Sequence, residues 1–314
     1  MRLIVMGTGP FAVPSLRALA ASDHEVATVV CKPPRGRRSE PPAPMASAAE
    51  SLGLPLWRPE TVNSAEAQNQ LAEFAADLMV VCDYGEILKD ATLQTTRLGG
   101  VNLHGSLLPR HRGAAPVQWA ILKGDTETGA SVIQMTPGLD AGPILGVVTV
   151  AIDPDETAGE LEDRLAPLGA ELVLRVVNEL ASGTASSAPQ DESLVTKAPR
   201  LDKSCAKINW TRPADWIKNH VRGLNPWPRA FTLVPRTKGD PLRLAVDRVQ
   251  IAAGGGEPGT VLAAEERLVV ACGEGAVELL IVQPAGKRAM PAADWLRGAK
   301  LAVGDVLGAE APSR

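Results

Sequence analysis

The chain has 314 residues, 45% of them hydrophobic, and a mean hydropathy near zero, so it is long enough for two globular domains with a substantial core. It contains no run of 18 apolar residues and opens with a buried-strand pattern instead of a secretory leader, so we expect a cytoplasmic protein without a membrane span. The net charge of −4 divides into −8 for residues 1–200 and +4 for residues 201–314, which indicates either a polyanionic partner for the last third or an ordinary solvated face.

Cysteine and histidine spacing argues against disulfides and metal. The four cysteines lie far apart with no Cys-x-x-Cys pair, and Cys31 and Cys82 end apolar runs, which is typical of inert buried thiols. No two of the four histidines have metal-ligand spacing on one helix or hairpin. We therefore expect no bound metal.

The first third of the chain alternates between strand and helix patterns. Strand patterns cover residues 2–6, 26–31 and 78–82, and helical patterns cover residues 11–21, 45–52 and 65–76. Continuous apolar runs are typical of parallel strands that are buried on both faces. The alternation therefore predicts an α/β fold with a Rossmann-like, doubly wound, mostly parallel sheet, whose ligands bind at the edge formed by successive strand ends.

The turn after the first strand has the sequence Gly7-x-Gly9-x-x-Ala12, which satisfies the loose fingerprint of dinucleotide-binding proteins. Pro10, however, removes a backbone N–H where a phosphate would need one, and Pro14 interrupts the first turns of the helix. The second strand also ends without an acidic residue for a ribose. We therefore expect no nicotinamide cofactor.

Two further segments follow strands at this edge. Arg35, Arg37 and Arg38 belong to a basic, proline-rich loop, which is either an exposed connection or a segment that grips phosphate with arginine side chains. The second segment, residues 83–88, holds the single tyrosine of the chain, Tyr84. Its place at a strand end fits either a wall of the site or a residue of the core.

The stretch at residues 101–109 is the strongest candidate for a functional site. Because side chains two apart in a strand share a face, Asn102 and His104 point the same way, at the point where the strand gives way to a loop. A second turn, residues 138–142, offers the carboxylate of Asp140. We predict that these three side chains meet, although a lone histidine and a turn aspartate are also common as structural residues.

The chemistry of this set favours direct transfer of an acyl-type group between two bound substrates. The sequence has no Gly-x-Ser-x-Gly elbow and no reactive cysteine pattern that would supply a covalent nucleophile. In this interpretation Asn102 and His104 face a developing oxyanion, while Asp140 accepts or relays a proton from an attacking amine.

The remaining patterns predict the end of the first domain, a connection and a second domain. Helical patterns at 116–123 and 157–182 and strand patterns at 131–135 and 144–150 complete the first domain. In the last third, a helical pattern at 215–224 precedes five short strand patterns, at 230–234, 242–251, 259–262, 267–271 and 276–282. We expect a catalytic domain of residues 1–182, a linker of residues 183–205 and a C-terminal OB-like β-barrel of residues 206–314.

Three segments of the sequence closely resemble the methionyl-tRNA formyltransferase family. They are Asn102-x-His104-Gly105-Ser106-Leu107-Leu108-Pro109-Arg110, Arg112-Gly113-Ala114-Ala115-Pro116 and Gly138-Leu139-Asp140-Ala141-Gly142. The N-terminal turn and residues 225–228 and 282–290 resemble the family as well, so the resemblance spans nearly the whole chain. It implies transfer of the formyl group of 10-formyltetrahydrofolate to the α-amino group of initiator methionyl-tRNA, which gives formylmethionyl-tRNA and tetrahydrofolate.

The resemblance also implies roles for particular residues. The catalytic roles fall on Asn102, His104 and Asp140. The residues expected around the folate are Ser106, Leu107, Leu108, Pro109, Tyr84, Gly85, Ile87 and Leu88. Contacts with tRNA are expected at Arg35, Arg37, Arg38, Lys203 and Lys207. The chain departs from the family pattern at Asp83 and Lys89, where an aliphatic or alanine residue and a proline are usual, and in a shorter basic loop.

Two alternatives stay open at this point. A formyltransferase acting on a small-molecule amine, such as a glycinamide nucleotide or an amino sugar nucleotide, would keep the chemistry but would not need the C-terminal domain. A nucleic-acid-binding protein without activity would need a broken triad, and all three residues are present. We also expect the protein to be a monomer.

Overall fold

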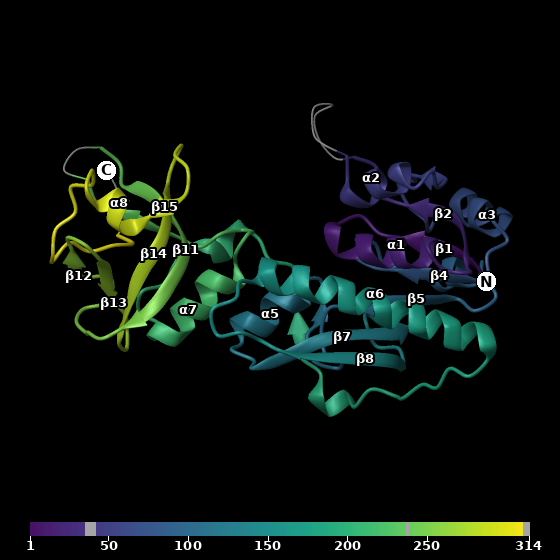
Figure 1. The fold of residues 1–314 in the computed structure, drawn as a ribbon. Coiled ribbons are helices and arrows are strands. Elements are labelled where there is room, and N and C mark those ends of the chain that lie inside the picture. The colour runs from purple at the N-terminus through teal and green to yellow at the C-terminus, as the bar shows by residue number, and fades with distance from the viewer. Residues whose placement is uncertain (35–41, 237–238, 310–314) are drawn as a thin grey trace. The chain divides into compact units, whose positions relative to one another are not determined.

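The computed structural model describes residues 1–34, 42–236 and 239–309, and the chain divides into two compact units (Figure 1). Unit 1 consists of Met1–Val117, Glu127–Ala151 and Leu161–Pro199. Unit 2 consists of Gln118–Thr126, Ile152–Glu160 and Arg200–Arg314. Each unit contains a β-sheet of its own.

Unit 1 is built on a seven-stranded sheet with the order β3-β2-β1-β4-β5-β7-β8. Its strands are β1 (Arg2–Met6), β2 (Glu25–Val30), β3 (Leu56–Trp57), β4 (Leu78–Val81), β5 (Gly100–His104), β7 (Glu127–Gln134) and β8 (Ile144–Ala151). The first five are parallel, and β7 and β8 add an antiparallel pair at one edge. The predicted Rossmann-like α/β fold is confirmed.

The helices of this sheet are short apart from the last one. They are η1 (Pro10–Ala12), α1 (Val13–Ala20), α2 (Pro44–Ser51), α3 (Ala65–Glu73), α4 (Asp90–Leu93), α5 (Pro116–Leu122) and α6 (Ala158–Ser182), and α5 and α6 each extend into unit 2. The helix predicted at 65–76 ends early because Ala75 has φ +47°, which a helix cannot contain. α6 lies close to the sheet, since a Cβ at Gly169 would stand 2.9 Å from the Leu103 side chain.

The sheet positions the segments that follow β4 and β5. Val81 at the end of β4 pairs with Asn102 of β5, and His104 lies opposite Ser131 of β7. The strands are held by a core that includes Ile4, Met79 and other fully buried aliphatic residues. Because both faces of β1 and β4 are covered, their residues cannot shift without opening this core.

The segment predicted as a linker, residues 183–205, contains η2 (Glu192–Leu194), β9 (Lys197–Ala198) and η3 (Lys203–Ala206). β9 pairs in parallel with β6 (Arg112–Gly113), which follows the loop after β5. Three backbone hydrogen bonds, from Arg112 to Thr196 and from Ala114 and Ala115 to Ala198, tie the two segments together. The chain therefore lies against unit 1 as far as Ala198.

Unit 2 contains an antiparallel half-barrel with the strand order β10-β11-β14-β13-β12, and β15 pairs with β14. Its strands are β10 (Phe231–Val234), β11 (Leu242–Ala252), β12 (Val261–Ala264), β13 (Leu268–Ala271), β14 (Ala276–Pro284) and β15 (Met290–Pro291), with helices α7 (Ala214–Gly223) and α8 (Ala292–Leu296). This sheet confirms the predicted OB-like fold. β12 begins two residues later than predicted, because Gly259 has φ +89° and turns the chain before the strand.

No helix in the described part of the chain is both long enough and apolar enough to cross a membrane.

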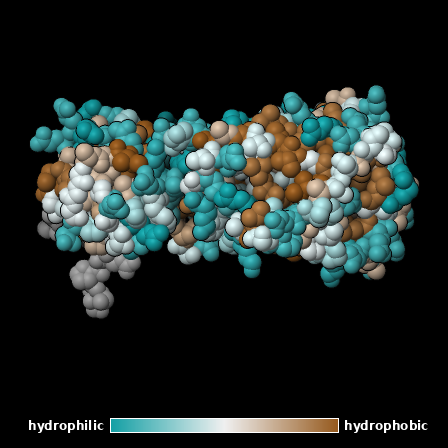
Figure 2. Space-filling model, turned by 90° about the horizontal axis from the view of Figure 1, so that it is seen from below, coloured by the Kyte–Doolittle hydropathy of each residue, from teal (hydrophilic) through white to brown (hydrophobic). Residues whose placement is uncertain are grey.

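Figure 2 shows one face of the molecule, on which apolar residues gather over unit 1. The edge strand of that unit, β8, alternates along its second half between half-buried and exposed residues, and Val147 is 41% exposed. An edge strand with one face in solvent produces this alternation.

Candidate active site

β5 and the turn between β7 and β8 bring the three predicted side chains together. The Asn102 amide Nδ2 donates to Asp140 Oδ1 at 3.4 Å, and His104 Nδ1 lies 3.7 Å from Asp140 Oδ2. The His104 side chain is buried and that of Asp140 is 11% exposed. An amide, an imidazole and a carboxylate thus share one sheltered site, as the strand alternation predicts for the first two.

The orientation of His104 follows from its contact with a backbone carbonyl. His104 Nε2 lies 2.9 Å from the carbonyl oxygen of His111, and because a carbonyl only accepts, Nε2 carries a proton. Burial lowers the pKa of His104 below its usual value, and the charge of Asp140 opposes this effect. The neutral ring therefore presents the lone pair of Nδ1 on the side where Asp140 lies.

The Asp140 carboxylate is held by a backbone group from another segment. Its Oδ2 accepts a hydrogen bond from the Gly113 N–H at 2.9 Å. Gly113 adopts φ +133°, and a Cβ there would stand 2.4 Å from the Ala198 carbonyl oxygen, so the position requires glycine. Asp140 itself has φ +48°, which an aspartate tolerates in a turn when its surroundings fix it.

The turn is also held by Gln190, which no motif or pattern in the sequence singles out. Its Nε2 donates to the carbonyls of Asp140 and Gly142, at 2.8 and 2.7 Å. A lone glutamine in a segment without periodicity carries no local signal, because its partners lie about fifty residues earlier in the chain. Gly113 belongs to a segment that resembles the family, but its contact with Asp140, 27 residues later in the chain, leaves no local signal either.

The loop after His104, predicted to lie beside the folate, is a compact turn tied to β7. Ser106 is fully buried, and its hydroxyl donates to the Arg110 carbonyl at 2.7 Å. The Ser131 hydroxyl donates to the Ser106 carbonyl at 2.7 Å and accepts from the Leu108 N–H at 3.2 Å. Leu108 is buried, whereas Leu107 and Pro109 are partly exposed. The turn is therefore preformed, and two of its apolar residues reach the surface.

The residues at 84–88 divide between core and surface. Tyr84 and Leu88 are 2% and 1% exposed and belong to the core cluster of the sheet, whereas Gly85 and Ile87 are exposed. The Tyr84 hydroxyl is buried and has no hydrogen-bond partner among the described residues. Burial is also the main cause that raises the pKa of this hydroxyl. The core role considered for Tyr84 thus matches its packing, and Gly85 and Ile87 are the members of this set that a ligand can reach.

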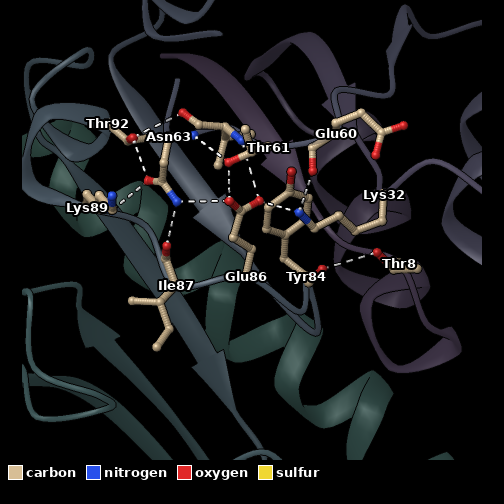
Figure 3. A network of polar contacts seen from close by, with 11 residues as sticks. Thr8, Lys32, Glu60, Thr61, Asn63, Tyr84, Glu86, Ile87, Lys89 and Thr92 are labelled. Atoms are coloured by element: carbon tan, nitrogen blue, oxygen red, sulfur yellow. Dashed lines mark hydrogen bonds and ion pairs between the residues drawn. The ribbon is translucent and has the colours of Figure 1, made fainter. Parts of the chain in front are cut away.

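A polar network holds this segment at Glu86 (Figure 3). Lys32 and the Thr61 hydroxyl bind the Glu86 carboxylate, which also accepts from Asn63 Nδ2 at 2.9 Å and from the Val62 N–H at 3.4 Å. Burial opposes ionisation of Glu86, but the hydrogen bonds and charge of these partners hold its pKa below the usual value. Glu86 is therefore an anchor for the loop.

Asn63 fixes the other half of the same segment. Its Nδ2 donates to the Ile87 carbonyl at 2.9 Å, and its Oδ1 accepts from the Lys89 N–H and the Thr92 hydroxyl, both at 2.8 Å (Figure 3). Lys89, one of the two departures from the family pattern, supplies the backbone N–H that a proline could not donate.

The second departure, Asp83, lies over the N-terminal turn. Asp83 has φ +47°, and a Cβ at Gly9 would stand 1.8 Å from Asp83 Oδ2, so the carboxylate packs directly on this glycine. Asp83 is exposed as a residue, but the loss of water around its carboxylate raises its pKa, and the Gly9 N–H, which hydrogen-bonds to it, opposes the shift. Burial, followed by the charges of Asp83 and Asp163, raises the pKa of Glu162 to about 7.

The residues predicted to contact tRNA do not lie in the described part of unit 1, unlike the triad and the predicted folate contacts. Arg35, Arg37 and Arg38 lie outside the described residues. Lys203 is exposed on η3, and Lys207, which follows η3, is partly exposed; both belong to unit 2. The site geometry on unit 1 therefore rests on the triad and the two loops beside the predicted folate position. In the described part of the chain, no group of three or more His, Cys, Asp or Glu residues is arranged to hold a metal ion.

Comparison with known proteins gives matches along the chain. A family model described as Formyl transferase matches residues 1–177, and one described as Formyl transferase, C-terminal domain, matches residues 200–300. The methionyl-tRNA formyltransferases of Parvibaculum lavamentivorans and Rhodopirellula baltica are each 46% identical to the chain. The first match covers 97% of this chain and 99% of the relative, and the second covers 98% and 96%.

Solved structures with similar folds include formyltransferases of other kinds. The N-formyltransferase from Helicobacter canadensis in complex with folinic acid and dTDP-3-aminofucose has a TM-score of 0.67 at 18% identity, over 90% of this chain and 98% of its own. Glycinamide ribonucleotide transformylase 1 from Symbiobacterium toebii has a TM-score of 0.51 at 21% identity, over 61% and 94%. Since the first of these shares the fold over 90% of the chain, a second domain does not by itself identify the acceptor, contrary to the sequence argument.

Proposed function

The chain belongs to the methionyl-tRNA formyltransferase family, and we propose that Asn102, His104 and Asp140 carry out its reaction. In that reaction the formyl group of 10-formyltetrahydrofolate passes to the α-amino group of methionyl-tRNA. The observation that supports the assignment is the convergence of the three side chains, with both oxygens of Asp140 within 3.7 Å of Asn102 or His104.

The amine must lose a proton after it attacks the formyl carbon, and the pair His104–Asp140 is placed to take it. The Nδ1 lone pair of His104 accepts the proton, and the Asp140 carboxylate stabilises the imidazolium that forms. The same proton then passes to N10 of the folate as the carbon–nitrogen bond breaks. Nε2 keeps its proton throughout and donates it to the His111 carbonyl in a hydrogen bond, so Nδ1 is the nitrogen that takes up and releases the proton.

Asn102 supplies the electrostatic part of this mechanism. One N–H of its amide is directed at Asp140 Oδ1, and an amide nitrogen carries a second N–H. That second donor stabilises the negative charge that develops on the formyl oxygen in the tetrahedral intermediate. This proposal differs from the sequence prediction, in which His104 faces the oxyanion with Asn102 and Asp140 accepts or relays the proton.

The two loops beside the triad are the proposed contacts of the donor substrate. We propose that the Ser106–Pro109 turn and the exposed residues Gly85 and Ile87 flank the folate, with Tyr84 and Leu88 supporting them from the core. The preformed geometry of the turn and the anchored position of Glu86 support this arrangement. Preformed walls lower the entropy cost of binding a ligand.

For tRNA, we propose that residues 206–314 form the binding domain, joined to the catalytic domain of residues 1–182 by residues 183–205. Residues 201–248 carry a net charge of +6, which suits a phosphate backbone, and Lys203 and Lys207 lie in this stretch. Arg35, Arg37 and Arg38 are proposed as further phosphate contacts. We also propose that the protein acts as a monomer in the cytoplasm, which light scattering and cell fractionation would test.

The experiment for this function compares acceptors at equal concentration. Methionyl-tRNA is expected to be formylated with 10-formyltetrahydrofolate, whereas an amino sugar nucleotide and glycinamide ribonucleotide are expected to give no product above background. The affinity for tRNA should fall steeply between 50 and 200 mM salt, by about 10³-fold if six phosphates are contacted. Formylation of a small amine in preference to methionyl-tRNA would refute the proposal.

A further inference from the structure

The turn that carries Asp140 is closed by one side-chain amide from a distant segment. Gln190 Nε2 donates to the carbonyl of Asp140 at 2.8 Å and to the carbonyl of Gly142 at 2.7 Å. These two carbonyls flank Ala141, so a single nitrogen ties both ends of the stretch whose conformation directs the Asp140 carboxylate. Because Asp140 has φ +48°, the turn depends on such outside contacts to keep its shape.

The other end of the Gln190 amide is fixed as well. Its Oε1 accepts from Arg112 Nε at 3.0 Å and from Arg112 Nη2 at 2.7 Å. A guanidinium can only donate, so the amide cannot rotate by 180° without losing all four contacts. The Arg112 side chain is 11% exposed, which shelters these hydrogen bonds from water.

Arg112 stands between the two residues that hold the rest of the triad. The carbonyl of His111 accepts from His104 Nε2, and the N–H of Gly113 donates to Asp140 Oδ2. Residues 111–113 thus contact the imidazole, Gln190 and the carboxylate in turn. Gln190 therefore couples the backbone that orients His104 to the backbone that bears Asp140.

We propose that Gln190 is a positioning residue for formyl transfer, whose amide sets the distance between Asp140 and His104. The inference rests on the proposed function of the triad. An error of about 1 Å in the placement of a reacting group can cost about 10²-fold in rate. Gln190 contacts the turn through the backbone carbonyls of Asp140 and Gly142, so its loss should affect turnover and leave substrate binding nearly unchanged.

The test uses the full-length protein with Gln190→Met, which keeps the length of the side chain and removes its hydrogen bonds. Gln190→Glu is the second variant, because it keeps the acceptor for Arg112 and replaces the donor with an oxygen that faces two carbonyls. Each is expected to lower kcat by about 10-fold or more while both KM values stay within about twofold. Glu192→Gln is the matched control, because it removes the exposed ion pair with Arg112 and leaves the Gln190 amide in place.

The pH profile separates positioning from a merely structural role. The charge of Asp140 raises the pKa of His104, so a displaced Asp140 should let that pKa fall and move the acid limb of kcat to lower pH in Gln190→Met. Glu192→Gln should keep the profile of the parent protein. The proposal is overturned if the parent protein formylates methionyl-tRNA and both Gln190 variants match it in kcat and in pH profile, or if their loss lies in KM. Absence of formylation by the parent protein would instead refute the proposed function.

Discussion

The two segments that flank the candidate site are both anchored by an amide side chain, but they differ in where charge is used. The turn of Asp140 is held by neutral donors, namely the amides of Gln190 and Asn102 and the Gly113 N–H. The loop at 84–88 is held by the Asn63 amide together with an ion pair between Lys32 and Glu86.

This difference matches what each segment must do. A lysine paired with Asp140 would neutralise the charge that the proposed mechanism needs beside His104, whereas neutral donors position the carboxylate and leave its charge available. Glu86 is not among the residues proposed to react, so its charge is free to pair with Lys32 and fix the loop. In this protein the proposed catalytic carboxylate is therefore held by uncharged side chains and a backbone group.

The largest effect is expected where the charge has been kept free. Asn102→Ala, His104→Ala and Asp140→Ala should each lower turnover by at least about 10²-fold. Asp140→Asn should do the same although it keeps the shape of the side chain, because it removes the charge that stabilises the imidazolium. Initial rates of methionyl-tRNA formylation measure the effect, and thermal unfolding checks the fold. Near-normal turnover in one of these variants would remove that residue from the mechanism.

A smaller effect, on a different constant, is expected at the charged anchor. Glu86→Ala removes the ion-pair partner of the Lys32 ammonium, and it should lower the free energy of unfolding by about 2 kcal/mol. The displaced loop should raise the KM for 10-formyltetrahydrofolate about fivefold, equivalent to about 1 kcal/mol, with kcat within twofold. Asn63→Ala should act on the same KM. Loss of kcat at an unchanged KM would abolish the contrast between the two anchors.

A control for Glu86 lies nearby, and a pH series sharpens the test. Glu60 is exposed and contributes its carbonyl to Lys32 at 3.3 Å, so Glu60→Ala should change neither constant. The pKa of Glu86 is lowered from 4.5 in the folded protein, so its ionised form stabilises the fold above about pH 4.5 and this contribution is lost as the pH falls. The stability gap between the parent protein and Glu86→Gln should therefore close at low pH.

The sequence predicts the part of the site that lies on β5, but not the residues that hold the turn of Asp140. The alternation of β5 fixes a common face for Asn102 and His104, because period two is a local property of a strand. Asp140 was a candidate as the carboxylate of a second turn and became specific through the resemblance, since nothing in a Gly-Leu-Asp-Ala-Gly turn reveals that it folds back onto β5. Gln190 could not be predicted at all, because its role arises from contacts with Arg112 and Gly142 that form only in the folded chain.

The fold is easier to predict from the sequence than the site is. Buried strands such as β2 and β4 are short, mostly apolar runs, so their type and their parallel pairing can be predicted from composition and alternation. β3, with two residues, is too short to leave a pattern, and α3 ends where Ala75 turns the chain. Boundaries depend on single backbone conformations, which the surrounding structure selects.

The smallest effect is expected at Glu162, a carboxyl group close to the loop anchored by Glu86 and without a role in the proposed mechanism. The pKa of Glu162 is raised to about 7, first by burial and then by Asp83, which begins the loop anchored at Glu86, and by Asp163. A raised pKa means that the neutral form suits the folded state, so stability is complete below about pH 4.5 and decreases as the pH rises towards and through 7. Glu162→Gln should therefore raise the free energy of unfolding at pH 8, by about 1 kcal/mol, and leave it unchanged at pH 4.

Denaturant unfolding at both pH values measures this difference, with Asp163→Asn, at an exposed residue, as a control of smaller effect. If the parent protein and Glu162→Gln differed equally at pH 4 and pH 8, ionisation of Glu162 would not destabilise the fold. The comparison of charged and neutral contacts would then apply only to Glu86 and Asp140.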